Sequence, residues 1–208
     1  MTAAAPALLV FAKEPVPGHV KTRLAASIGN EGAAAAYREL TALTLGHAVH
    51  AHQTGIVDRI ELWCAPSPDS AYFRALAADC GGSLHTQSGA DLGERMEHAI
   101  ADALTRAASV MLIGTDCPVL DATRLALAHD QLDEFDAVLG PAEDGGYVLV
   151  GSRVPLDFGA TRWSSPHAFA DTVAAFAATG IRWTELPVSW DVDTPADLAR
   201  FYAAHLSV

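Results

Sequence analysis

Three cationic side chains stand close together near the N-terminus, in the segment FAKEPVPGHVKTRL at residues 11–24. Lys13, Lys21 and Arg23 could together neutralise a di- or triphosphate. The two prolines stiffen the segment, and Gly18 permits a close backbone approach. A solvated basic loop is the plainer alternative, and the segment contains neither GxxxxGK[ST] nor GxGxxG. We expect these three cations and Gly18 to bind the phosphates of a nucleotide.

A carboxylate follows the apolar run of VMLIGTDCP at residues 110–118, where a strand is expected to end in Gly114, Thr115 and Asp116. Magnesium in phosphate chemistry is typically held by one or two carboxylates together with substrate oxygens. The plainer alternative is a cap for the next helix, but Asp121 is the better candidate for that cap. We therefore expect Asp116 to bind the metal, with Gly114 and Thr115 beside the nucleotide.

A pair of carboxylates occurs in DVDTPADL, where Asp191 and Asp193 alternate. In an extended segment they would point to opposite sides, so at most one should face a metal directly. We expect that residue to be Asp193, with Asp191 supporting it or binding through water. Helix capping is the alternative role, but Thr194 is available for it. Asp116 and Asp193 are thus the predicted ligands of Mg²⁺, or of Mn²⁺ in its place.

A third acidic segment is GPAEDGGYVLVG at residues 140–151. Glu143 and Asp144 precede a glycine pair, and Gly145 and Gly146 would let the backbone pass close to a ligand. A simple turn is the alternative. We expect Asp144 or Glu143 to orient or deprotonate an acceptor, with both glycines contacting the substrate and Lys21 assisting the chemistry.

Two further segments give weaker signals of substrate binding. Glu94 and Arg95 open an expected helix and could reach a substrate, although a solvated first turn explains them equally well. Trp163 belongs to a polar and aromatic patch that could line an acceptor pocket or precede a helix cap. The nine histidines lack HExxH spacing, so we expect neither a zinc site nor a histidine-based triad.

The elements that must position these residues follow from alternating apolar runs and alanine-rich segments. Strands are expected at residues 8–11, 60–64, 110–113, 137–139 and 147–150. Helices are expected at residues 30–52, 70–79, 92–107, 123–132, 166–178 and 195–205. The alternation predicts a mostly parallel sheet covered by helices, with ligands beyond the carboxyl ends of the strands. The last two strands follow each other without a helix, which predicts an antiparallel or mixed element.

Composition narrows the classes of partner. The chain has 208 residues, of which 50% are hydrophobic, and a formal net charge of -12. We expect one domain over residues 1–208. The negative charge opposes binding to nucleic acids and anionic membranes, and the apolar run at residues 7–12 is far shorter than a membrane span. Three cysteines without CxxC spacing fit a reducing cytoplasm. A homodimer is one state that the sequence permits.

Taken together, FAKEPVPGHVKTRL, GTDCPVL, GPAEDGGYVLVG and DVDTPADL resemble bacterial arsenosugar-biosynthesis-type glycosyltransferases of the GT-A nucleotide-diphospho-sugar transferase superfamily. The KTRL element is also similar to that of phospholactate guanylyltransferases, and the DVDTP element to molybdenum-cofactor nucleotidyltransferases. The resemblance covers nearly the whole chain. It implies a Rossmann-like three-layer α/β sandwich with a mostly parallel mixed sheet. It also implies that Asp116 and Asp193 match the two metal-binding aspartates of the superfamily.

Three functions remain open at this point. The first is transfer of a sugar from a nucleotide sugar to a small acceptor, with a divalent cation neutralising the departing nucleoside diphosphate. The second is nucleotidyl transfer, in which a phosphorylated acceptor attacks a nucleoside triphosphate and pyrophosphate departs. The glycine-rich LAGGxSxRMG opening of many nucleotidyltransferases is absent here. The third is a nucleotide-binding module without chemistry, because a fold never guarantees activity.

Overall fold

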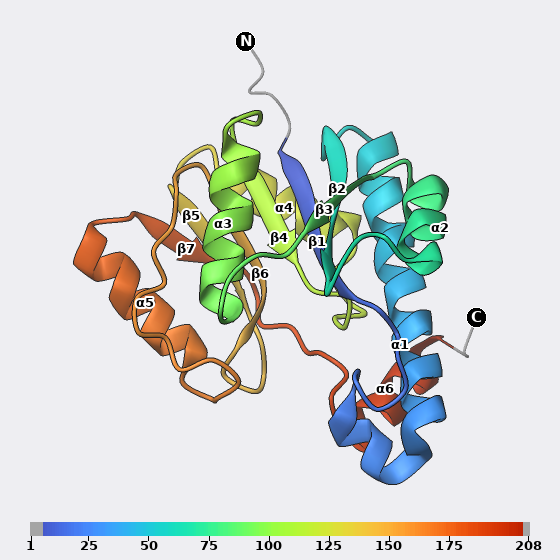
Figure 1. The fold of residues 1–208 in the computed structure, drawn as a ribbon. Helices are drawn as coiled ribbons and strands as arrows, with labels where there is room; N and C mark the ends of the chain where they lie inside the picture. The colour runs from blue at the N-terminus through green and yellow to red at the C-terminus, as the bar shows by residue number, and fades with distance from the viewer. Residues whose placement is uncertain (1–5, 206–208) are drawn as a thin grey trace.

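Seven strands form one sheet in the computed structural model, which describes residues 6–205. The strands are β1 (Ala7–Lys13), β2 (Arg59–Ala65), β3 (Ser83–Thr86), β4 (Val110–Ile113), β5 (Ala137–Pro141), β6 (Tyr147–Ser152) and β7 (Trp183–Glu185). They lie in the order β3-β2-β1-β4-β6-β5-β7 (Figure 1). β6 runs antiparallel to β4 and β5, and the other pairs are parallel. The predicted α/β fold with a mostly parallel, mixed sheet is therefore confirmed.

Side chains of the central strands alternate between two apolar clusters, one on each face of the sheet. In β1, Leu8 and Val10 belong to one cluster and Leu9 to the other, and all three are fully buried. In β4, Met111 and Leu112 divide in the same way. A strand buried on both faces is a continuous apolar run in sequence. The central strands are consequently the most recognisable elements of the chain.

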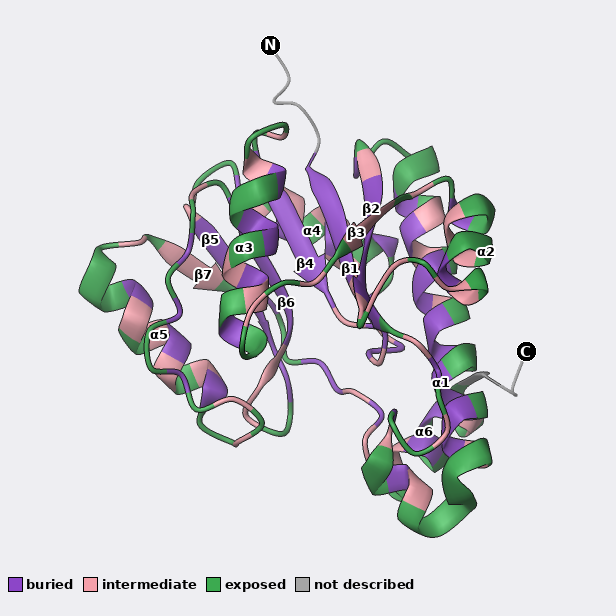
Figure 2. Cartoon of the chain, in the orientation of Figure 1, coloured by how far each residue is buried: buried purple, intermediate pink, exposed green. Residues whose placement is uncertain are grey.

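Helices cover both faces and complete three layers. They are α1 (Thr22–Gln53), α2 (Ala71–Cys80), α3 (Leu92–Leu104), α4 (Ala122–Gln131), α5 (Ala168–Thr179) and α6 (Pro195–His205). α1, α2 and α4 pack on the face that carries Leu8, whereas α3 and α5 pack on the face that carries Leu9. The strands are mostly buried, and each of these helices turns an exposed side outward (Figure 2). Within the described residues, no helix is both long and apolar enough to cross a membrane.

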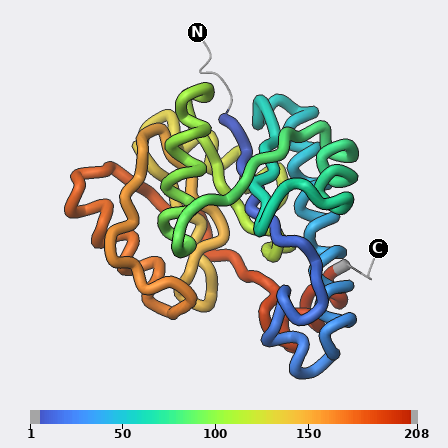
Figure 3. Tube along the Cα trace, in the orientation of Figure 1, coloured from blue at the N-terminus to red at the C-terminus, as the bar shows by residue number. Residues whose placement is uncertain are grey.

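The first turns of α1 lie beside α6, although the two are separated by most of the chain (Figure 3). Leu24 of α1 packs in a third apolar cluster with Trp190 and Phe201. α1 starts earlier than the predicted residue 30 because a short helix precedes a break at Gly29, where φ is 75° and ψ is 163°. The segment from β7 to α6 crosses below the sheet to reach this cluster (Figure 1). It thereby passes the carboxyl ends of the central strands.

All five predicted strands and all six predicted helices are present, and apart from the earlier start of α1 their bounds shift only slightly. The sequence missed β3 and β7, which lie at the two edges of the sheet. Both are short and only partly buried, so they carry no continuous apolar run. The expected antiparallel element is confirmed as β6 between β4 and β5. The expected caps are also confirmed, because Asp121 accepts from the Arg124 amide and Thr194 accepts from the Asp197 amide.

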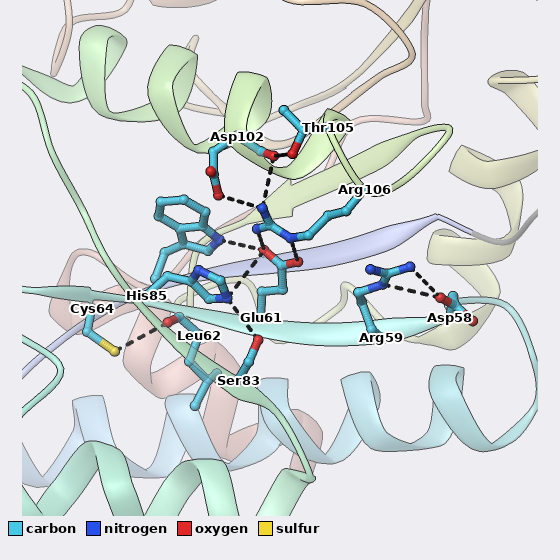
Figure 4. Close-up of polar contacts among 11 residues, drawn as sticks. Asp58, Arg59, Glu61, Leu62, Cys64, Ser83, His85, Asp102, Thr105 and Arg106 are labelled. Atoms are coloured by element: carbon cyan, nitrogen blue, oxygen red, sulfur yellow. Dashed lines mark hydrogen bonds and ion pairs between the residues drawn. The ribbon is translucent and has the colours of Figure 1, made fainter.

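A buried carboxylate in β2 is satisfied by a polar cluster under α3 (Figure 4). Glu61 is 1% exposed and accepts two hydrogen bonds from Arg106, at 3.1 and 2.9 Å. The Trp63 indole donates to it at 3.2 Å, and His85 Nε2 lies 3.7 Å away. Asp102 holds the other side of the Arg106 guanidinium at 2.7 Å. These contacts fix the end of α3 to the sheet.

Replacing Arg106 with methionine tests this anchor. Arg106→Met leaves the Glu61 carboxylate buried without its cation, which should lower the free energy of unfolding by about 3 kcal/mol. Arg59→Met is the matched control. Arg59 lies on the same strand as Glu61, and among residues 6–205 its ion pair is with Asp58 at the surface, so its loss should cost less than about 1 kcal/mol. Urea denaturation measures both. Equal losses in the two variants would contradict the anchoring role.

The three cysteines, Cys64, Cys80 and Cys117, are all free and buried. Burial raises the pKa of the Cys64 and Cys117 thiols to about 12. Because the thiolate is the reactive form, neither should react readily near neutral pH. We expect slow labelling by an aromatic disulfide reagent at pH 8 in the native protein, and rapid labelling of all three thiols in guanidinium. Rapid native labelling of Cys117 would show that its strand end is open to solvent.

Candidate functional site

A cavity of about 790 Å³ lies at the carboxyl ends of the central strands and collects the predicted chemical segments. The predicted site residues that line it are Lys13, Lys21, Arg23, Arg95, Gly114, Thr115, Asp116, Asp144, Gly146, Trp163 and Asp193. The predicted residues that do not line it are Gly18, Glu94, Glu143 and Gly145. The structure thus brings most of the predicted residues together, while their roles stay predictions.

Three carboxylates converge at one end of the cavity. Asp116 follows β4, and Asp191 and Asp193 come from the segment before α6. One carboxylate oxygen from each lies within 4.8 Å of the others. Residues 190–193 do not form a strand, so the alternation of an extended chain does not separate Asp191 from Asp193. Which of the two would contact the metal directly stays a prediction.

Lys21 lies between two of these carboxylates. Its Nζ donates to Asp116 Oδ2 at 3.0 Å and to Asp193 Oδ1 at 2.9 Å. The Lys21 side chain is 6% exposed. Arg23, which is 64% exposed, donates to the other oxygen of Asp193 at 3.1 Å. The carboxylates are therefore held by cations from the segment that sequence reasoning assigned to phosphates.

Crowding of negative charge changes the proton affinity of these groups. Burial, followed by the charges of Asp116 and Asp193, raises the pKa of Asp191 to about 7. Burial alone would also raise the pKa of Asp116, but the Lys21 ammonium holds it below its ordinary value. The pKa of Lys21 is raised by the two carboxylates, against the opposite effect of burial. A positive charge at this position is strongly favoured.

Backbone contacts fix the carboxylate loops to each other. The Val192 amide donates to the Asp116 carbonyl at 2.9 Å, and the Val192 side chain is fully buried beside α1 and α6. Gly114 makes room for the Asp116 carboxylate, because a Cβ there would lie 2.9 Å from Asp116 Oδ1. The Asp193 amide donates to Asp197 in the first turn of α6. The strand end and the helix start are therefore one unit.

Tyr37 joins the ends of β1 and β4 from the side of α1. Its hydroxyl accepts from the Lys13 amide at 2.8 Å and from the Thr115 hydroxyl at 3.0 Å. Tyr37 is 6% exposed and Thr115 is 3% exposed. Burial raises the pKa of Tyr37, so the phenol stays protonated. The tyrosine fixes the backbone next to Asp116 without using a charge.

The β5–β6 hairpin separates the two acidic residues that sequence reasoning treated together. Asp144 lines the cavity, and its Oδ1 accepts from the Gly146 amide at 2.9 Å. Glu143 pairs instead with Arg200 of α6 at 2.9 Å, and its side chain is 58% exposed. Gly145 has φ 87°, and the Pro166 carbonyl occupies the space where its Cβ would lie. Of the two acids, Asp144 is the one placed to meet a ligand.

The wall on the side of α3 combines an aromatic ring and a cation. The Trp163 indole packs over Gly93, where a Cβ would lie 2.8 Å from the indole Nε1. Arg95 lines the cavity, and its Nε donates to the Gly89 carbonyl at 3.1 Å. Glu94 turns to the Ala90 amide at 2.7 Å, which makes it a local cap. The predicted substrate contacts at Trp163 and Arg95 are therefore accessible from the cavity, unlike Glu94.

The carboxylate cluster fits a divalent cation. Its donors are oxygens, which Mg²⁺ prefers and Mn²⁺ accepts. The three oxygens lie close enough to share one ion, and cationic side chains already gather at the same oxygens. Asp116, Asp191 and Asp193 are the residues that could hold the ion.

Sequence reasoning missed several residues that line the cavity, including His19, Tyr37 and Gln87. Gln87 follows β3, and its Nε2 donates to the Ala12 and Trp63 carbonyls. It was missed because β3 itself was missed. Tyr37 lies within a long helix and shows no local signal. His19 lies between Lys13 and Lys21, and no spacing in the sequence distinguishes it from the other histidines.

Removing the Tyr37 hydroxyl tests the link between β1 and β4. Tyr37→Phe leaves the buried Thr115 hydroxyl and the partly buried Lys13 amide without this acceptor, and the free energy of unfolding should fall by about 2 kcal/mol. Tyr72→Phe is the matched control, because within residues 6–205 the buried Tyr72 hydroxyl has no hydrogen-bond partner. Its loss leaves no donor unpaired, so the free energy of unfolding should stay the same or rise. Urea denaturation separates these outcomes, and an equal effect at both positions would remove Tyr37 from this role.

Solved structures resemble the chain to different degrees. A protein from Desulfovibrio desulfuricans G20, described provisionally as a nucleotide-diphospho-sugar transferase, shares 31% identity over 99% of this chain and 89% of that chain, with a TM-score of 0.85. The 4-diphosphocytidyl-2C-methyl-D-erythritol synthase of Anaerococcus prevotii DSM 20548 is 9% identical, with coverage of 97% and 98% and a TM-score of 0.64. Glucosyl-3-phosphoglycerate synthase of Mycobacterium tuberculosis, in complex with Mn²⁺, UDP and glucosyl-3-phosphoglycerate, is 12% identical, with coverage of 95% and 75% and a TM-score of 0.55.

The last two similarities establish a common fold alone. A comparison with curated proteins gave no match. A family profile matches residues 47–165, which include β2, the Asp116 loop and the Asp144 hairpin. The chain therefore belongs to the family described as "Uncharacterized protein conserved in bacteria (DUF2064)".

Proposed function

We propose that this chain is a divalent-cation-dependent transferase that moves a group from an activated nucleotide to a small acceptor. The observation that carries the proposal is the meeting of three carboxylates with Lys21 and Arg23 in one cavity at the strand ends. A polyphosphate and its cation need these two kinds of side chain side by side. The nucleotide-using transferases with the same fold support this class of reaction.

One group of residues would bind the phosphates of the donor nucleotide. Asp116 and Asp193, supported by Asp191, would hold a cation whose positive charge stabilises the departing phosphate oxygens. Lys13, which forms no ion pair with any described residue, can donate to the phosphates. The Arg23 side chain is exposed, and it can exchange its ion pair with Asp193 for a contact with a phosphate. Charge that develops on the leaving group is then met by side chains already in place.

The acceptor end lies on the other side of the cavity. Asp144 reaches the cavity with one carboxylate oxygen held by the Gly146 amide, so its other oxygen can take a proton from an acceptor hydroxyl. Trp163 and Arg95 line the same cavity and would set the shape and charge of the acceptor pocket. Glu143 is held by Arg200 outside the cavity and is the weaker candidate for this base.

Transfer of a sugar from a nucleotide-diphosphate sugar is the reaction that we propose first. The 31% identical structure carries that description, and the glycine-rich opening typical of many nucleotidyltransferases is absent from this sequence. Nucleotidyl transfer is the second candidate, since a nucleotidyltransferase fold superposes with a TM-score of 0.64. A specialised role in arsenosugar biosynthesis, a cytoplasmic location, a single domain and a homodimer stay predictions from the sequence.

A thermal-shift screen against nucleotide sugars and nucleoside triphosphates, each with and without Mg²⁺, tests the class of donor. Binding to the folded state raises the melting temperature. We expect a magnesium-dependent rise with a nucleotide sugar that exceeds the rise with the matching triphosphate. A preference for a triphosphate would instead select nucleotidyl transfer. No shift with either set would contradict the proposed class of donor.

Asp116→Asn tests the metal assignment once a donor is identified. The amide removes a negative ligand at the strand end, so turnover should fall by about a thousandfold while the fold is retained. Asp121→Asn is the control, because Asp121 is five positions away and serves only as a helix cap. Its turnover should stay close to that of the wild type. Near-normal turnover of Asp116→Asn, with circular dichroism unchanged, would reject the assignment.

A further inference from the structure

Lysine and arginine together number 13 in the chain, and only Lys13 and Lys21 are lysines. Both lysines line the same cavity. Arginine forms the anchoring ion pairs elsewhere, including those to Glu61 and Asp171. A guanidinium is suited to fixed, bidentate contacts, whereas an ammonium is a compact charge with three donors on a flexible stem. Lysine is therefore restricted to the place where a cation could need to change partners.

We propose that Lys21 is an exchangeable counter-ion. Its ammonium holds Asp116 and Asp193 together while no divalent cation is bound, and it transfers to phosphate oxygens of the donor when a cation takes these carboxylates. This inference rests on the proposed function, whose metal ligands are the same carboxylates. It adds that metal binding and phosphate binding are coupled through one side chain.

Competition for oxygens is the first argument. Lys21 occupies Asp116 Oδ2 and Asp193 Oδ1, and Arg23 occupies Asp193 Oδ2. Both oxygens of Asp193 are thus already engaged. A divalent cation that binds Asp193 would compete with these contacts for the oxygen lone pairs and would repel both cations, and the contact made by Lys21 is the one shared with Asp116.

Charge balance is the second argument. Asp116, Asp191 and Asp193 offer three negative charges when all are ionised, against two positive charges on Lys21 and Arg23. Adding a divalent cation makes the cluster positive. Phosphate groups would remove that excess, and the released ammonium could donate to them. Each ligand would consequently favour the other, and by linkage the effect is reciprocal.

The backbone conformation of Lys21 is uncommon, and the contacts of its side chain would help to hold it. Lys21 has φ 45° and ψ 48°, a left-handed conformation that is uncommon for a residue other than glycine. It stands just before α1, and Gly29 interrupts that helix before its main part begins. Lys13, in contrast, belongs to β1 and forms no ion pair with a described carboxylate, which makes it a natural control.

The affinity of the nucleotide-free protein for Mn²⁺, measured by electron paramagnetic resonance, tests the exchange. Lys21→Met removes the competing ammonium, and we expect Mn²⁺ to bind at least about tenfold more tightly than in the wild type. Lys13→Met removes a cavity cation that makes no such contact, and its effect should be less than about threefold. Unchanged or weaker Mn²⁺ binding in folded Lys21→Met would overturn the proposal.

A measurement on the wild-type protein covers the case in which Lys21→Met does not fold. Acetylation of the two lysines with acetic anhydride is followed by mass spectrometry, with and without Mg²⁺. We expect Mg²⁺ to accelerate modification of Lys21 at least about threefold while Lys13 changes little. Bound Mg²⁺ with no change at Lys21 would reject the exchange and leave the metal site intact. Failure of both the wild type and folded Lys21→Met to bind either ion would reject the metal site itself.

Discussion

The candidate site depends on the ion pairs of Lys21 with Asp116 and Asp193. These pairs join Lys21 to residues that follow it in the sequence by 95 and 172 positions. Three carboxylates within 4.8 Å would repel one another without a cation between them. The remaining contacts keep that cation in place: Val192 ties the two acidic loops together, and Tyr37 fixes the strand ends beside them. The sheet and its helices determine where these groups meet.

Sheet topology explains why residues so distant in sequence share one cavity. β1 and β4 are parallel neighbours, so Lys13 at the end of β1 and Asp116 after β4 lie at the same carboxyl end of the sheet. β6 runs antiparallel to β4, so it begins at that same end of the sheet. The turn that precedes β6 places Asp144 there. After the outer strand β7, the chain passes below the sheet toward α6, and this segment carries Asp193.

Much of this fold could be predicted from sequence because the central strands are buried on both faces and appear as apolar runs. The edge strands β3 and β7 carry no such pattern, and Gln87 was missed with β3. Chemistry-bearing motifs located the cavity, but they could not separate Glu143 from Asp144, because that difference depends on Arg200 in a distant helix. The closeness of Asp191 to Asp193 could not be predicted from the alternation of an extended chain, because residues 190–193 do not form a strand.

The segments before and after the break at Gly29 contribute different kinds of contact to the site. Tyr37 lies after the break at Gly29, and its hydroxyl fixes the backbone of Lys13 and the side chain of Thr115 by neutral hydrogen bonds. Lys21 lies before the break and contributes a charge held only by carboxylates that a divalent cation would also bind. Hydrogen bonds between neutral groups do not compete with an incoming ion, whereas ion pairs do. A fixed support within α1 and an exchangeable charge just before its first turn therefore lie on opposite sides of one glycine.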